Sequence, residues 1–181
     1  MLASGKLLIA EPFLGDPNFE RSVILICQHD EQGSFGLTLN QTTNLYLKDV
    51  LKDEIYAHIP IYQGGPVEKN TLHFIHNLGN LVEDTIQIAE DLYWSGDFEQ
   101  VKTLLNIGKI TEEDIRFFVG YAGWSAGQLA GELTQNAWIV TDAEADFIFN
   151  TPAEQCWRAI LKKMDGKYKA IANYPKDPRL N

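Results

Sequence analysis

Short blocks of aliphatic and β-branched residues recur along the chain, separated by turns rich in glycine, proline, asparagine and aspartate. Such blocks are typical of strands. Ser22–His29 (SVILICQH) is apolar at nearly every position, which predicts a strand buried on both faces. Together with Gly36–Gln41 it predicts a hairpin across a turn at Asp30–Gly33. The strands predicted in this way are Lys6–Glu11, Ser22–His29, Gly36–Gln41, His58–Gln63, Leu72–His76, Thr85–Ala89, Arg116–Tyr121 and Trp138–Thr141.

Other stretches carry the i, i+3, i+4 spacing of apolar residues that marks an amphipathic helix. Three of them begin with the residue pattern of a capping box, in which two side chains three positions apart bond free backbone amides at the helix start. These pairs are Asp97 with Gln100, Ser125 with Gln128, and Thr151 with Glu154. The predicted helices are Leu45–Asp53, Asp97–Gly108, Ser125–Asn136 and Thr151–Met164.

Strands and helices mix without a regular strand–helix–strand alternation, which favours an α+β fold with a mixed sheet. A chain of 181 residues with 45% apolar residues can bury its own core. Internal repeats, low-complexity segments and linkers are not evident in the sequence. We therefore expect residues 1–181 to form a single domain.

Charge is distributed unevenly along the chain. The net charge is −10, but residues 158–181 carry seven basic and two acidic side chains, a balance of +5, which leaves −15 for the first 157 residues. An acidic body repels phosphate backbones, so direct DNA binding is disfavoured. We expect the basic end, residues 158–181, to pack on the acidic body. Contact of this segment with a nucleic acid is the alternative.

The sequence also favours a cytoplasmic protein without a membrane segment. It lacks a run of about 18 apolar residues, and its first residues hold too short an apolar stretch for the core of a signal peptide. Cys27 and Cys156 form neither a disulfide framework nor a Cys-x-x-Cys pair. Two reduced thiols in a reducing compartment are the simplest interpretation.

Residues 123–127 (GWSAG) fit the Gly-x-Ser-x-Gly pattern of a nucleophile elbow, which would make Ser125 a hydrolase nucleophile. In that fold the catalytic histidine follows the serine, whereas all four histidines of this chain precede Ser125. The capping box with Gln128 gives Ser125 a structural role instead. Gly127 and Gly131 disfavour the helix that follows, which predicts a close approach by another element or by a ligand, close packing being the commoner reason.

Cys27 and His29 lie two positions apart on a predicted strand and should share a face, so thiol or redox chemistry at Cys27 is a second enzymatic alternative. A buried structural cysteine is the more frequent case. His73 and His76 should face opposite sides of their strand, which argues against a metal site. Residues 64–66 (GGP) lack the lysine of a phosphate-binding loop and predict a tight turn with positive φ. We therefore expect neither a metal nor a cofactor.

Taken together, several motifs resemble the AlgH/YqgE family of bacterial proteins. The motifs are GKLLIAEPFLGDPNFERSVILICQHDEQGSFGLTLNQ (Gly5–Gln41), YQGGPV (Tyr62–Val67), FIHN (Phe74–Asn77), FFVGYAGWSAGQLAGEL (Phe117–Leu133), NAW (Asn136–Trp138) and the DPRLN end. The resemblance implies an α+β fold with a mixed, partly barrel-like sheet flanked by helices. Family members are commonly labelled transcriptional regulators, and no accepted enzymatic reaction comes with the family.

The resemblance also implies a set of recurring polar residues. They are Asp16, Arg21, Ser22, His29, Asn40, His76, Gln128, Glu132 and Asn136.

Glycines next to aromatic residues suit a pocket in which backbone amides and a flat ring contact a ligand. We expect such a cleft between a 64–66 turn, a 120–124 turn and the 16–22 loop. The candidate residues are Asp16, Arg21, Ser22, His29, Asn40, Gly64, Gly65, Pro66, His76, Gly120, Tyr121, Gly123, Trp124, Gln128 and Glu132. The resulting hypothesis is a non-enzymatic binding or regulatory protein that acts through a small anionic ligand or a protein partner. The sequence leaves the oligomeric state open.

Overall fold

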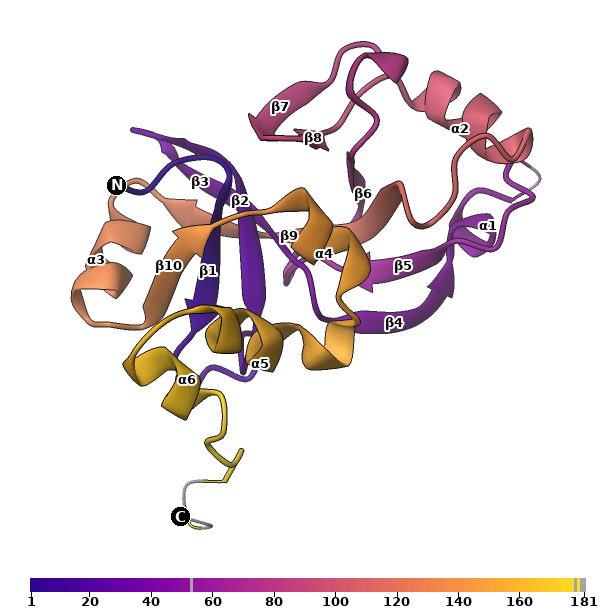
Figure 1. Cartoon of the computed structure of the whole chain (residues 1–181). Helices are drawn as coiled ribbons and strands as arrows, with labels where there is room; N and C mark the ends of the chain where they lie inside the picture. Colours follow the sequence, from indigo (N-terminus) through magenta and orange to yellow (C-terminus); the bar gives the residue numbers. More distant parts are fainter. Residues whose placement is uncertain (53, 178, 180–181) are drawn as a thin grey trace.

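Ten strands form one curled, half-barrel sheet in the computed structural model, which describes residues 1–52, 54–177 and 179 (Figure 1). The strand order is β10-β1-β2-β3-β9-β6-β8-β7, and β4 and β5 join it through β9. The strands are β1 (Lys6–Ala10), β2 (Val23–Asp30), β3 (Gly33–Thr38), β4 (Thr42–Tyr46), β5 (Pro60–Gln63), β6 (Val67–His76), β7 (Ile86–Ala89), β8 (Leu92–Trp94), β9 (Ile115–Ser125) and β10 (Trp138–Asp142). The predicted α+β fold is confirmed.

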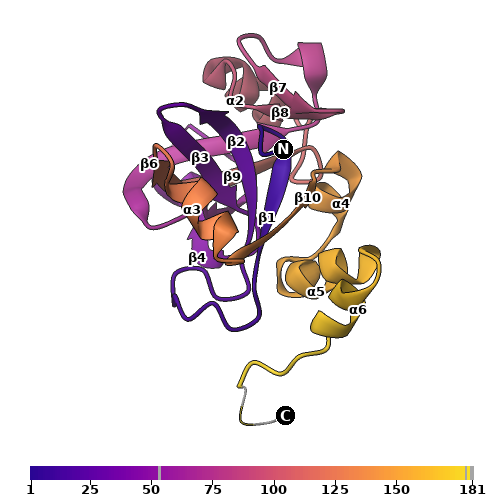
Figure 2. The same ribbon diagram turned by 90° about the vertical axis from the view of Figure 1, so that its left-hand side faces the viewer.

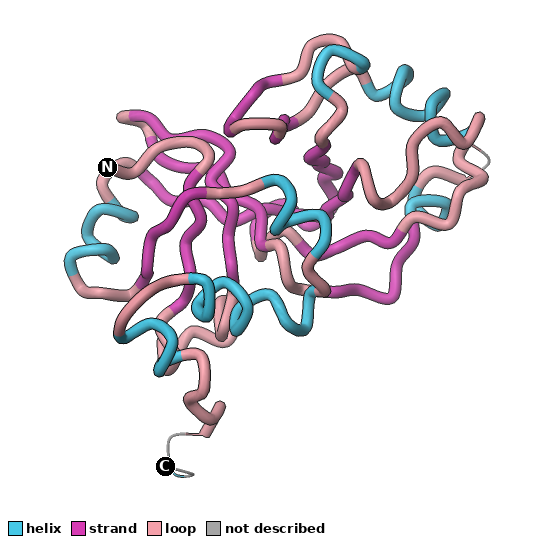
Figure 3. The backbone as a smooth tube through the Cα atoms, in the orientation of Figure 1, coloured by secondary structure: helices cyan, strands magenta, loops and turns pink. Residues whose placement is uncertain are grey.

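Helices surround the sheet at its periphery (Figure 3). They are α1 (Leu47–Val50), α2 (Phe98–Asn106), α3 (Gln128–Thr134), α4 (Ala145–Asn150), α5 (Ala153–Lys163) and α6 (Lys167–Ile171), with a 3₁₀ turn at Gly79–Leu81. Within the part of the chain that the structure describes, none of them has the length and apolar character needed to cross a membrane.

Strand β9 joins the two parts of the sheet. Its last residues, Ala122–Ser125, pair with β3, and its first half pairs with β6 on one side and with β5, in parallel, on the other. Side chains alternate along this first half. Ile115 and Phe117 enter the core shared with α1 and α2, whereas Phe118 enters the core beneath α4–α6.

Strands β1 and β2 are covered on both faces, as the apolar run at residues 22–29 predicts (Figure 2). Leu7 and Leu25 pack in the same core as Trp157 of α5. Leu8 and Ile24 pack on the opposite face with Leu129 of α3. The sheet is therefore a middle layer in this part, between α3 and the C-terminal helices.

Several predicted elements differ from the structure. The predicted Leu45–Asp53 helix is wrong, because Thr42–Tyr46 pairs with β5 as β4 and leaves a single helical turn, Leu47–Val50. Asp53 lies outside the described residues. Strand β8 and helices α4 and α6 were not predicted, since each spans only three to six residues. The predicted turn at 120–124 is also wrong, as these residues continue β9.

All three predicted capping boxes differ from the structure. Asp97 does cap α2, its carboxylate accepting a hydrogen bond from the Gln100 amide at 3.1 Å, but the Gln100 side chain accepts from the Glu83 amide at 2.8 Å instead of from Asp97. Helix α5 starts after Pro152 and has no side-chain cap. Helix α3 starts only at Gln128, because Ser125 still pairs with Gly33 as the last residue of β9.

Candidate functional site

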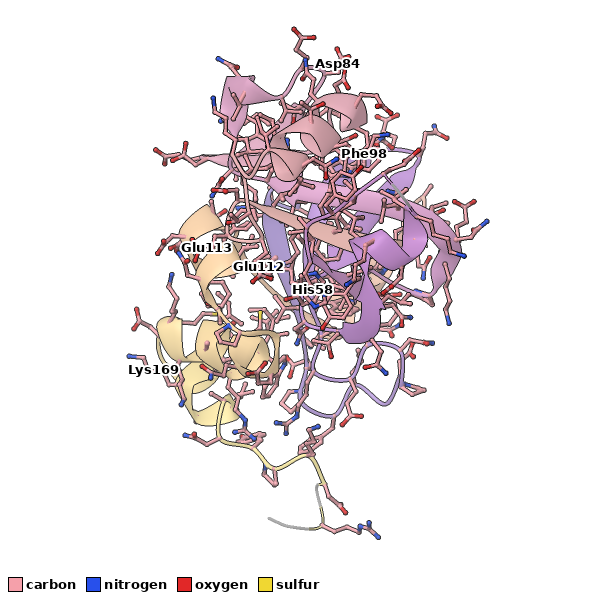
Figure 4. The ribbon with its side chains drawn as sticks, turned by 90° about the vertical axis from the view of Figure 1, so that its right-hand side faces the viewer. His58, Asp84, Phe98, Glu112, Glu113 and Lys169 are labelled. Carbon is pink, nitrogen blue, oxygen red and sulfur yellow. The ribbon has the colours of Figure 1, made fainter. Side chains whose placement is uncertain are left out.

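A pocket of about 250 Å³ opens where β5 and the start of β9 meet the junction of α4 and α5. Tyr62 and Arg116 come from the strands, and Asn150 and Thr151 come from the helical junction. Glu112 and Glu113, just before β9, complete the rim; both lie near α4 in Figure 4. The pocket therefore combines one basic side chain with two exposed carboxylates.

Arg116 is the unusual residue of this pocket. Its side chain is only 9% exposed, and its guanidinium carbon lies 4.8 Å from the centroid of the Tyr62 ring. The hydrogen bonds and ion pairs found among the described residues include none to its guanidinium. Its nitrogens are also not among the enclosed polar atoms without a partner, so they remain accessible from the pocket. Among the described residues, this buried cation therefore has no carboxylate in hydrogen-bond or ion-pair contact, although buried charges are normally paired in this way.

Burial lowers the pKa of the Arg116 guanidinium, and nearby Tyr62, Cys156 and Glu112 act in the opposite direction. An arginine keeps its proton at neutral pH even so. Its planar fork of donors matches a carboxylate in a bidentate arrangement. The chemistry available at the pocket floor is thus recognition of a carboxylate or a similar planar anion.

The position of Arg116 follows from the alternation along β9. Arg116 pairs with Ile75 of β6. Its neighbours Ile115 and Phe117 both face the core shared with α1 and α2, so Arg116 points to the opposite side of the sheet. The prediction from sequence missed Arg116 as a site residue. The available signal was a single charged residue within the otherwise apolar run of residues 115–119 (IRFFV).

Comparison with known proteins places the chain in a family. The profile of the AlgH-like family matches residues 7–169. The chain belongs to the AlgH-like family. A UPF0301 protein of Cytophaga hutchinsonii is 43% identical over 182 residues and covers 100% of both chains. A UPF0301 protein of Parabacteroides distasonis is 42% identical over 98% of this chain and 90% of its own length.

Two solved structures share the fold. The AlgH protein from Pseudomonas aeruginosa has a TM-score of 0.74 and 32% identity, covering 95% of this chain and 94% of its own. Protein DIP2367 from Corynebacterium diphtheriae has a TM-score of 0.80 and 24% identity, covering 96% of this chain and 93% of its own. The family membership predicted from the motifs is therefore confirmed.

The polar residues predicted for this AlgH-like chain fall into separate groups. One group holds the 16–22 loop in place. Asn40 Nδ2 donates to the Arg21 carbonyl at 2.9 Å, and its Oδ1 accepts from the Val23 amide at 3.0 Å. Asp16 accepts from the Asn18 amide at 2.9 Å. These bonds stabilise the loop, and Ser22 is buried beside them.

Arg21 differs from Arg116 because its guanidinium has a protein acceptor, although its Nε is buried without a hydrogen-bond partner among the described residues. It donates to the Tyr174 carbonyl at 2.7 Å, and its guanidinium carbon lies 4.4 Å from the centroid of the Trp157 ring. Phe13 also stacks on Tyr174, with ring centroids 6.2 Å apart. These contacts hold Tyr174 of the C-terminal segment against Phe13 and Arg21.

A second group lies around Glu132 of α3. Its Oε2 accepts from the indole N–H of Trp124 at 2.9 Å and of Trp138 at 2.7 Å. Its Oε1 accepts from Gln128 Nε2 at 3.1 Å. Phe19 packs against both indoles, with ring centroids 6.4 Å from Trp124 and 5.7 Å from Trp138. Gln128 and Glu132 therefore bind each other, and Glu132 also binds both tryptophans.

Ser125 belongs to the same group. Gln128 Oε1 accepts from the Ser125 amide at 3.0 Å, which is half of the predicted capping box. The other half is missing, because Ser125 Oγ contacts Gln128 Oε1 at 3.3 Å instead of a helix amide. Ser125 therefore lies just before α3 and contacts Gln128. Among the described residues it makes no hydrogen bond to a histidine.

The histidines and Cys27 lie apart from these groups. A bulge in β2 between Ile26 and Gln28 places Cys27 in the core and leaves His29 exposed, so the expectation that the two share a face is wrong. Burial raises the pKa of the Cys27 thiol. His29 Nδ1 lies 2.7 Å from Ser34 Oγ. Of the described residues, no three His, Cys, Asp or Glu side chains gather in a way that could hold a metal ion.

His76 is fully buried in a network of its own. Its Nδ1 accepts from the Leu78 amide at 3.2 Å, so Nε2 carries the proton and faces the Ser95 carbonyl at 3.0 Å. Thr85 Oγ1 lies 2.8 Å from the same Nε2. This arrangement fixes β6 against the β7–β8 hairpin.

The candidate glycines serve close packing. A Cβ at Gly64 would lie 2.3 Å from the Gly120 carbonyl oxygen, and one at Gly65 would lie 2.1 Å from the Tyr121 carbonyl carbon. Neither Gly64 nor Gly65 has positive φ, so that expectation is wrong; Gly120 has φ 68°. Around Gly127 and Gly131 no heavy atom of another described element lies within 4 Å of a Cβ position, which contradicts the predicted close approach there.

Two other candidates lie next to these glycines. Pro66 follows Gly65 and is half-buried, and Gly123 faces the Tyr121 ring at 3.2 Å from its Cβ position. Asp16 lines a space of about 290 Å³ under the 12–17 loop, and Trp124 lines another, of about 230 Å³, beside β3; neither involves Arg116. The single cleft expected from the sequence stays a prediction, while Arg116 marks a different place.

Proposed function

We propose that this protein is a binding protein for a small ligand that carries a carboxylate or similar planar monoanion, and that Arg116 holds this group. The observation that carries the proposal is the guanidinium of Arg116, which is nine-tenths buried, lies over the Tyr62 ring and makes no hydrogen bond or ion pair with a carboxylate of the described residues. A bound carboxylate would supply the missing acceptor and a charge-assisted, bidentate hydrogen bond. A regulatory role through such a ligand is compatible with the net charge of −10, which disfavours direct contact with DNA.

The surroundings of the two candidate nucleophiles, Ser125 and Cys27, favour binding over catalysis. Ser125 Oγ contacts Gln128 and lacks a base partner among the described residues. Cys27 is buried, and its raised pKa keeps the thiol protonated at neutral pH. Neither side chain belongs to the Arg116 pocket.

The test is a binding screen of the purified protein with small mono- and dicarboxylates, nucleotides and inorganic phosphate, followed by calorimetry and amide chemical-shift mapping. We expect one or more carboxylates to bind with shifts at residues 112–118 and 149–151. Arg116→Gln should weaken binding at least tenfold, since one bidentate charged pair is worth more than a factor of ten. Arg116→Lys should restore only part of it, because lysine offers a point charge.

The control is Lys48→Gln, which removes an exposed cation outside the pocket lining. A backbone spectrum of each variant confirms that it is folded. Binding that survives Arg116→Gln unchanged, or a screen without any carboxylate that binds, would overturn the proposal.

A further inference from the structure

A second pocket continues the Arg116 pocket along α4. Its volume is about 370 Å³, and it shares Glu113, Phe149 and Asn150 with the first. The two together form one groove, which we call the α4 groove, that runs from Arg116 toward the start of α4 and the β7–β8 turn at Asp91. Figure 4 looks onto this side of the molecule, with Glu112 and Glu113 beside the ribbon of α4.

Carboxylates dominate the α4 groove. Glu112 and Glu113 line its Arg116 end, and Asp91, Asp114 and Asp146 line its far end. Arg116 is the single basic side chain in the lining of either pocket, as far as the described residues go. A ligand in the groove therefore meets one cation at the pocket floor and several anions along the walls.

Part of this acidic wall makes no hydrogen bond or ion pair with the other described residues. Asp146 accepts from Asn150 Nδ2 at 2.6 Å, and Asp114 accepts from the Thr111 amide at 2.9 Å. The side chains of Asp91, Glu112 and Glu113 take part in none of the hydrogen bonds or ion pairs found among the described residues. Like charges gathered on one wall lower the cost of bringing in a cation and raise that of a polyanion.

We infer that the ligand is a small zwitterion, with a carboxylate for Arg116 and an ammonium or guanidinium group for the acidic wall. Amino acids with a basic or terminal amine have this chemistry. Phosphates and nucleotides do not, because their second and third negative charges would face Glu112 and Glu113. The inference rests on the proposed function, since it assigns the second end of a ligand whose first end Arg116 binds.

The experiment uses a matched series of probes on the full chain. It compares ω-amino acids of four to six carbons, together with lysine and arginine, against the fatty acids and the primary amines of the same lengths and against inorganic phosphate. Calorimetry or chemical-shift titration at low ionic strength gives each dissociation constant. We expect at least one amino acid to bind tenfold tighter than both its fatty acid and its amine.

Two variants separate the ends of the ligand. Arg116→Gln should remove the advantage of the amino acid over the amine. Glu112→Gln combined with Glu113→Gln should remove its advantage over the fatty acid while the fatty acid's own affinity stays or increases. Glu31→Gln combined with Glu83→Gln is the control, because it makes the same change in net charge at exposed positions outside the groove.

The outcomes distinguish this inference from the proposed function. If fatty acids or phosphate bind as well as the amino acids and depend on Arg116, the zwitterion inference is overturned and the carboxylate site stands. If the amines alone bind, or the double glutamate variant keeps the full preference, the inference is also overturned. If none of the probes binds, both are overturned.

Discussion

The indole nitrogen of Trp138 donates to Glu132 Oε2 at 2.7 Å. The same oxygen accepts from Trp124 Nε1 at 2.9 Å, so one carboxylate of α3 joins β10 to β9, two strands at distant positions in the sheet order. Both indoles are almost completely buried, with 5% and 6% of their surfaces exposed. Two hydrogen bonds to a charged acceptor in such surroundings stabilise more than neutral ones.

Glu132→Ala should therefore lower the free energy of unfolding by about 2–4 kcal/mol, since two indole donors lose a charged acceptor. Glu132→Gln keeps one acceptor oxygen and should cost about half as much. Urea unfolding followed by tryptophan fluorescence measures both, and the exposed Glu90→Ala serves as the control. A loss below about 0.5 kcal/mol for Glu132→Ala would show that water replaces the carboxylate without penalty.

Gly65 and Gly131 should respond in opposite directions to alanine. At Gly65 the new Cβ would lie 2.1 Å from the Tyr121 backbone, which must shift; we expect a loss of more than about 2 kcal/mol or failure to fold. At Gly131, inside α3, no other described element lies within 4 Å of the new Cβ, so alanine should stabilise by about 0.5–1 kcal/mol through helix propensity. Denaturant midpoints of the two variants test the pair, and equal effects would contradict the packing described for Gly65.

Stability should fall as the pH falls through the range in which His76 would gain a proton. Burial lowers the pKa of His76 below its ordinary value, and the Ser95 carbonyl opposes this only in part. At a pH between the folded and the unfolded pKa of His76, the unfolded chain thus binds more protons than the folded one. The free energy of unfolding therefore decreases as the pH decreases. A second proton would also remove the bond from the Leu78 amide to Nδ1.

Unfolding measured between about pH 8 and pH 5.5 tests this. His76→Gln should be less stable overall but show a shallower pH dependence than the wild type. His73, whose pKa burial also lowers, keeps a residual slope in the variant. Identical slopes in the two proteins would contradict the prediction.

Both thiols should be slow to react in the folded protein. Burial raises the pKa of Cys156 to about 11, with Arg116 opposing, and raises that of Cys27 as well. At pH 7.4 fewer than about one Cys156 in a thousand is then ionised, against roughly one in ten for a free cysteine. Ellman's reagent should detect two thiols at once in guanidinium and almost none in buffer. One fast equivalent in buffer would revive the thiol hypothesis for Cys27.

Local sequence patterns predicted most strands of the sheet but not the short elements that connect them. The 22–29 run and the Asp97 cap were sufficient for β2 and α2, because their apolar spacing and capping chemistry agree with the tertiary structure. The helix expected over residues 45–53 failed because pairing of Thr42–Tyr46 with β5 outweighs helix propensity there. Elements as short as β8 leave too few positions for a period to be recognised.

The candidate site was less predictable than the fold. Glycine and aromatic residues at 64–66 and 120–124 suggested a ligand cleft, which stays a prediction. In the structure, Gly64 and Gly65 let the segment after β5 pass close to the backbone of β9. For Arg116 the sequence shows only a charged residue within an apolar run. That its guanidinium has no carboxylate partner among the described residues depends on the α4–α5 junction and on β5, which approach it from distant parts of the sequence.

The pairing of β1 with β10 has a consequence for biosynthesis. The partner of Lys6 is Asp142, a separation of 136 residues. At a synthesis rate of roughly 5–20 residues per second, β1 waits on the order of ten seconds on the ribosome for that partner. During this time the apolar edge of the first strand is open, and open edges invite association with other chains. Strand β1 therefore gains its second neighbour only after β10 has been synthesised, later than the other strands of the sheet.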